Sequence, residues 1–190
     1  MAQLLGEALT LRAVIYLDLI KGWGDVPARF EPITTETIYL SRTNRDEIYK
    51  QLLVDLAEAE GLVAWPNETS VTSTTERINK AFVKGLTARI ALYASGYSQR
   101  GDGVRRSNDP ELSVEKMYKL AKDKSLEVIQ KGSNRLGEFE DTFRALCMDD
   151  VTAGKESLWE IPFASGRGRV LFTLGVQHRR ADQYTDQPRG

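Results

Sequence analysis

The amino-acid sequence predicts a mainly α-helical fold, made of helix pairs with long inserts and a short β-hairpin near the C-terminus. Four segments repeat apolar residues at helical spacing, and a glycine follows each of them. Two later segments rich in aromatic and β-branched residues flank the turn-like sequence SGRGR. With 190 residues, the chain can form one domain with a proper core or a piece of a larger one.

The first helix is expected over residues 2–21, where one apolar stripe predicts its buried face. Gly22 and Gly24 end it, and Pro27 keeps the following segment extended. We expect Trp23, between the two glycines, to be a buried plug at this turn, so that Trp23→Ala costs about 2–4 kcal/mol. The stripe consists of Leu4, Ala8, Leu11, Ile15 and Leu19.

Three further helices are expected over residues 45–60, 76–95 and 113–132. Asn44 followed by Glu47 predicts the start of the second one. The third has a face of small residues around Gly85 that would admit a partner helix, and Ala121 and Ser125 of the fourth are the expected partners. Because the order helix, insert, helix occurs twice, the pattern indicates tetratricopeptide-like helix pairs.

The predicted β-hairpin has strands at residues 156–163 and 168–178, with Trp159 in the core. We therefore interpret residues 1–190 as a single partial domain. Residues 1–135 form its tetratricopeptide-like part, and residues 136–190 begin an irregular lobe that contains the hairpin.

Composition and motifs argue against several classes of function. A net charge of −1 offers no field that would attract nucleic acid. The single cysteine, Cys147, excludes an internal disulfide and a zinc site made of several cysteines, and it is expected to be buried. A nucleophilic pair of Cys147 with His178 is disfavoured, and Asp149 and Asp150 are interpreted as solvated loop charges. We expect no enzyme, no cofactor and no metal.

Two aromatic residues in the inserts are the candidate ligand-binding residues. Trp65 follows the second helix and Tyr97 opens the charged insert after the third. Exposed aromatic rings with polar neighbours are typical of carbohydrate sites. The alternative for each is a loop aromatic that covers the core of a helix pair.

The ordered motifs GWGDVPARFEPIT, SRTNRDEIYKQLLVDLAEA, RINKAFVKGLTARIALYASGY, AKDKSLEVIQKG and ESLWEIPFASGRGR resemble the SusD/RagB family. The resemblance implies a tetratricopeptide-like helical part with an added ligand-binding lobe. It also implies a non-enzymatic, lipid-anchored surface protein of the Gram-negative outer membrane. Such proteins bind oligosaccharides or polysaccharides for nutrient uptake, and their partner is a SusC-like TonB-dependent transporter.

Family members are more than twice as long as this chain, so the resemblance implies an internal fragment. The lipid anchor would be the only membrane attachment, and it is absent from this chain. If flanking helices are missing, the apolar face of the first helix becomes exposed and self-association is expected. The alternative function is a helical scaffold that binds a peptide or a protein.

Overall fold

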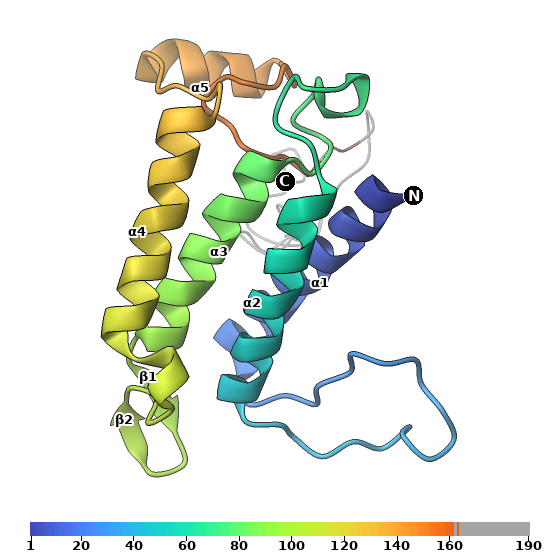
Figure 1. Ribbon diagram of the computed structural model, residues 1–190, viewed down its shortest axis with the longest axis vertical. Coiled ribbons are helices and arrows are strands. Elements are labelled where there is room, and N and C mark those ends of the chain that lie inside the picture. Colours follow the sequence, from blue (N-terminus) through green and yellow to red (C-terminus); the bar gives the residue numbers. More distant parts are fainter. Residues whose placement is uncertain (162, 164–190) are drawn as a thin grey trace, which may run out of the picture. The chain divides into compact units, whose positions relative to one another are not determined.

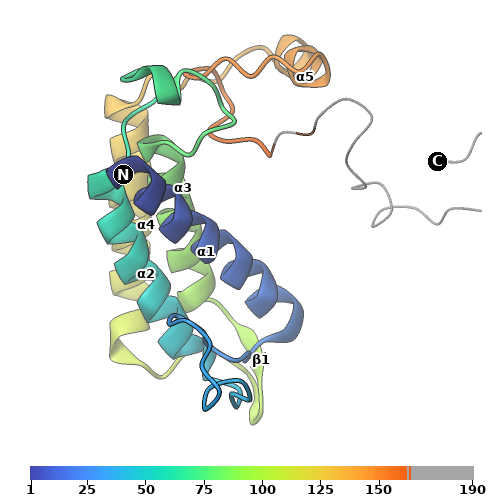
Figure 2. The same cartoon turned by 90° about the vertical axis from the view of Figure 1, so that its right-hand side faces the viewer.

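The computed structural model describes residues 1–161 and 163. A compact unit spans Met1–Glu160, and its long helices lie side by side (Figure 1, Figure 2). In chain order α1 packs on α2, α2 on α3 and α3 on α4. The mainly helical fold is confirmed, and the small antiparallel hairpin that it contains lies at residues 98–105 and not at the predicted place. Its elements are α1 (Ala2–Trp23), α2 (Arg45–Leu62), η1 (Ser70–Thr72), α3 (Lys80–Ser95), β1 (Ser98–Arg100), β2 (Gly103–Arg105), η2 (Pro110–Leu112), α4 (Val114–Lys131) and α5 (Phe139–Cys147).

Side-chain caps set the starts of the central helices. Asn44 caps α2 as expected, because its side chain accepts a hydrogen bond from the Asp46 backbone N–H at 3.0 Å. Asn79 does the same for α3 by accepting from the Phe82 N–H at 3.1 Å. This cap makes α3 begin at Lys80, four residues later than the apolar pattern predicts.

The buried face of α1 differs from the predicted one. Its core side carries Ala13, Tyr16, Leu17 and Ile20, whereas most of the predicted stripe, including Ile15, faces solvent. The reason is close packing at Gly6, where an added Cβ would lie 3.1 Å from the Leu62 Cβ at the end of α2. The side with the smallest residue approaches α2, and the outer apolar side is left exposed. Its exposed members are Leu4, Leu5, Leu11 and Ile15.

The pairing of α3 with α4 uses fewer small residues than predicted. Ala88 and Ala121 are buried, but Ser125 is exposed. Gly85 faces Leu158 instead of a helix, since an added Cβ there would lie 3.1 Å from the Leu158 Cδ1. The small-residue face of α3 therefore contacts two neighbours: α4, and the segment after α5 that contains Leu158.

The hairpin that forms within the described residues is β1–β2, with Ser98 paired to Arg105 and Gly103 at the turn. The strand predicted at 156–163 is wrong for its described residues, which are not in a strand. The chain from Val151 to Glu160 instead makes backbone hydrogen bonds with residues 73–75: Ala153 N–H donates to Ser73 O at 3.1 Å, and Glu160 N–H donates to Thr75 O at 2.9 Å. The second predicted strand, 168–178, lies outside the described residues.

Trp159, in the first predicted strand segment (156–163), packs against the core as expected. Trp159 is half-buried against the core, with its ring centre 4.7 Å from that of Phe82.

The prediction that Cys147 is buried is wrong. It is exposed at the end of α5, a helix that the sequence analysis missed and that buries none of its residues. No described helix has the length and apolar character needed to cross a membrane.

Candidate functional site

A surface cleft of about 620 Å³ lies where the end of α1, the start of α2, the end of α3 and β1 meet. These segments lie at one end of the helix bundle, and α5 lies at the other (Figure 2). We call this site the aromatic cleft, because four of its lining residues are aromatic. It is lined by Ile20, Lys21, Gly22, Trp23, Gly24, Arg45, Tyr49, Tyr93, Tyr97, Ser98 and Gln99.

Trp23 stands at the surface of the cleft with 75% of its area exposed, so the prediction of a buried plug is wrong. The turn after α1 does not need a side chain to close it. Gly24 has a φ of 73°, and its backbone N–H donates to Ile20 O at 2.8 Å. The helix end is therefore satisfied by backbone geometry, which leaves the indole free to face solvent.

Three tyrosines complete the aromatic lining. Tyr97 and Tyr93 are 69% and 46% exposed, so both present ring area to solvent. Tyr49 is buried beneath them, and burial raises its pKa to about 12. The phenol of Tyr49 is thus neutral at physiological pH.

Arg45 supplies the charged group of the cleft. It is 9% exposed, and its Nε donates to Asp25 Oδ1 at 2.7 Å. Burial raises the pKa of Asp25, but the hydrogen bonds from Arg45 outweigh it and hold that pKa below its usual value. No hydrogen bond from either Nη atom of Arg45 occurs among the described residues. A Cβ at Gly24 would lie 3.0 Å from Arg45 Cζ, so this glycine makes room for the guanidinium.

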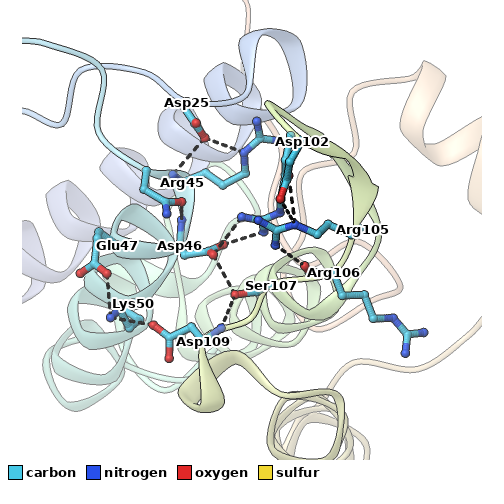
Figure 3. A network of polar contacts seen from close by, with 12 residues as sticks. Asp25, Arg45, Asp46, Glu47, Lys50, Asp102, Arg105, Arg106, Ser107 and Asp109 are labelled. Atoms are coloured by element: carbon cyan, nitrogen blue, oxygen red, sulfur yellow. Dashed lines mark hydrogen bonds and ion pairs between the residues drawn. The ribbon is translucent and has the colours of Figure 1, made fainter.

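A polar network behind the cleft fixes the β1–β2 hairpin to α2 (Figure 3). The Asp46 carboxylate accepts two hydrogen bonds from Arg100, at 2.9 and 2.8 Å, and one from Ser107 Oγ at 2.7 Å. Lys50 pairs with Asp109 at 2.9 Å, and this hydrogen bond raises the Lys50 pKa. Because β1 carries Ser98 and Gln99, the network also holds one wall of the cleft in place.

Tyr97, the first sequence-predicted site residue, lies in this cleft. The Arg106 guanidinium stands over its ring, 4.7 Å from the ring centre. One face of the ring is therefore covered by the cation, which restricts the orientation of the side chain.

Trp65, the second sequence-predicted site residue, lies past the C-terminal end of α2, away from the cleft. This helix has 18 residues and is about 27 Å long. It is half-buried, 3.7 Å from where a Cβ on Gly132 would be, and the Lys84 Nζ is 5.8 Å from its ring centre. Lys84 is buried between Glu60 and Glu127, which hold its pKa above its usual value although burial lowers it. The structure does not bring Trp65 and Tyr97 together.

The remaining candidates show no catalytic arrangement among the described residues. Asp150 forms an ion pair with Lys155 at 2.5 Å, which lowers the Asp150 pKa to about 2, and Asp149 is exposed beside it. These two residues are loop charges, as expected. Cys147 is exposed, and His178 lies outside the described residues. Residues 1–161 contain no group of three metal-ligating side chains.

Comparison with known proteins gives one family. Residues 1–92 match the model of SusD-like proteins, which is described as starch-binding and associating with the outer membrane. No curated protein sequence matches the chain.

Several solved structures have the same fold. A SusD homologue from Bacteroides thetaiotaomicron is 18% identical with a TM-score of 0.68, over 86% of this chain and 29% of its own. A SusD superfamily protein from Bacteroides fragilis is 20% identical with a TM-score of 0.65, over 87% and 31%. A structure with xylogluco-oligosaccharide is 19% identical with a TM-score of 0.64, over 86% and 30%. This chain thus spans about three tenths of the length of these structures.

Proposed function

We propose that this chain, whose residues 1–92 match the SusD-like family model described as starch-binding and associating with the outer membrane, is part of a protein that binds glycans at the bacterial cell surface. The family match is the observation that carries the proposal. The neighbour with xylogluco-oligosaccharide supports an oligosaccharide as the ligand. We propose binding without catalysis, since the described residues contain no catalytic arrangement and the family is named for binding.

The finer parts of the proposal concern uptake. We propose that the full protein is a surface-exposed lipoprotein and delivers its glycan to a SusC-like TonB-dependent transporter. Association of the family with the outer membrane supports this location.

Trp65 and Tyr97 are the proposed ligand-binding residues from sequence. Their surroundings differ: Tyr97 is exposed in the aromatic cleft, whereas Trp65 is half-buried against α4 and Lys84. Mutating each to alanine separately therefore tests two separate places on the protein.

The test is affinity electrophoresis of the protein through gels that contain a soluble polysaccharide. The panel is starch, xyloglucan and polygalacturonate, and a protein of similar size that binds no glycan serves as the reference. We expect slower migration of the protein, relative to the reference, in at least one neutral-glycan gel. Equal relative mobility in every gel would contradict the proposed function.

A second candidate is a helical scaffold that contacts a peptide or another protein. The exposed outer face of α1, with Leu4, Leu11 and Ile15, favours it, because soluble proteins seldom leave such a stripe uncovered. The two functions are compatible, since the stripe residues do not line the aromatic cleft.

A further inference from the structure

We propose that the aromatic cleft is a binding subsite for an uncharged segment of an oligosaccharide, with Trp23 and Tyr97 as stacking platforms and Arg45 as the hydrogen-bond donor. The inference rests on the proposed glycan binding and assigns it to a particular place. It also gives Trp23 a role in ligand binding in place of the structural one that the sequence suggested.

The stacking surface comes from rings that the fold exposes without structural need. Trp23 is 75% exposed although the backbone of Gly24 already closes the end of α1. Exposed tryptophan is costly in water, and a sugar ring presents a face of C–H groups that covers such a surface. Tyr97 lies in the same cleft and keeps one ring face away from Arg106. Two platforms in one cleft suit a chain of at least two sugar units.

The donor comes from a buried cation with free N–H groups. Arg45 is 9% exposed and lines the cleft, yet neither of its Nη atoms has a hydrogen-bond partner among the described residues. Two Nη–H groups in a fixed fork match two neighbouring acceptor oxygens, such as the hydroxyls on adjacent carbons of a pyranose. Because this guanidinium is largely withdrawn from water, each bond that it gives to a ligand is strengthened.

The charges in and beside the cleft favour a neutral sugar over a uronic acid. Asp25 already neutralises Arg45 through a 2.7 Å hydrogen bond, and the lowered pKa keeps Asp25 ionised. Lys21 is paired with Asp18 at 3.1 Å. Each cation of the lining thus has a carboxylate partner, so the lining itself offers no unpaired positive charge to a second anion. The Arg106 guanidinium, beside the cleft, stands over the ring of Tyr97.

The test uses alanine variants of the two platforms in the gels described above. We expect Trp23→Ala and Tyr97→Ala each to weaken binding to the retarding neutral glycan by about tenfold, which is about 1.4 kcal/mol. Trp23→Phe, which keeps a platform, should retain most of the binding. Tyr118→Ala is the matched control, because Tyr118 is 53% exposed on α4 and does not line the cleft.

Four outcomes separate the inference from the proposed function. Loss of retardation in both cleft variants, with Tyr118→Ala unchanged and all melting temperatures close to wild type, supports the inference. Unchanged retardation of both cleft variants overturns it and leaves glycan binding by the protein intact. Retardation by polygalacturonate alone overturns the neutral-sugar assignment, and no retardation of the wild type in any gel overturns both.

Discussion

The substitution Asp46→Asn tests how the β1–β2 hairpin is held against α2. The side chains of Asp46 and Arg100 are 8% and 9% exposed, and the pair is joined by two hydrogen bonds of 2.9 and 2.8 Å. Asparagine has nearly the same size as aspartate, so the substitution removes the charge and one acceptor without opening a cavity. The amide turns N–H groups toward a guanidinium that can only donate.

The expected loss of stability arises because the buried Arg100 guanidinium loses its charged partner. Removing one partner of a buried ion pair costs about 3–5 kcal/mol, because the other charge stays buried. Arg100 Nε is already buried without a partner, so among the described residues no acceptor lies within hydrogen-bond reach of it. The amide oxygen can still accept one of the two bonds, which places our expectation at about 3 kcal/mol, the lower end of that range.

Urea unfolding followed by circular dichroism measures this loss, with Asp123→Asn as the control. Asp123 pairs with Lys119 on the surface of α4, with 46% of its side chain exposed, so the same chemical change there should cost less than about 0.5 kcal/mol. If the two variants lose equal stability, the buried pair does not hold the hairpin as argued here. Arg100→Met combined with Asp46→Asn should be more stable than Asp46→Asn alone, because no charge is left buried.

Three further predictions concern the cleft and α1. Trp23→Ala should lower the unfolding free energy by less than about 1.5 kcal/mol, since only about 60 Å² of the indole is buried; a loss above 3 kcal/mol in urea would restore the buried-plug interpretation. The raised pKa of Tyr49, about 12, makes stability fall as pH rises from about 10 through 12, because the unfolded phenol ionises first; Tyr49→Phe should flatten this part of a melting-temperature profile, and an unchanged slope would contradict it. Ile15→Lys should reduce self-association of the protein in light scattering, whereas a wild type that stays monomeric at high concentration would show that the exposed face of α1 does not drive association.

The helices could be predicted from the sequence because their signals are local. Apolar spacing predicted α2 and α4 to within a few residues. Asn44 marked the start of α2 and Gly132 the end of α4, whereas α2 continues past Gly61 to Leu62. The buried side of a helix could not be predicted from such local signals. The stripe of α1 is apolar, but Gly6 allows the opposite side to approach α2 more closely. Close packing outweighed the count of apolar residues.

The β1–β2 hairpin was missed for a related reason. Its residues, 98–105, carry two arginines and an aspartate, a composition that predicts a charged insert. Arg100 is charged and yet 9% exposed at its side chain, because Asp46 of α2 neutralises it. A charged strand of this kind can be recognised only when its partner is known, and that partner lies 54 residues away in the chain.

The candidate site shows the same limit most clearly. The position of Tyr97 in an insert predicts a ligand-binding residue, and the fold places Tyr97 in the cleft. The motif around Trp23 predicts a buried residue at a turn, and no sequence pattern points to Arg45. The local motif around Trp23 indicates correctly that a helix ends there. Whether the indole is then buried depends on residues distant in the sequence, which the local motif does not reveal; the Arg45 guanidinium, for example, lies beside Gly24. Arg45, 22 positions after Trp23, lines the same cleft. In our inference it supplies the hydrogen bonds to the ligand on which the indole stacks.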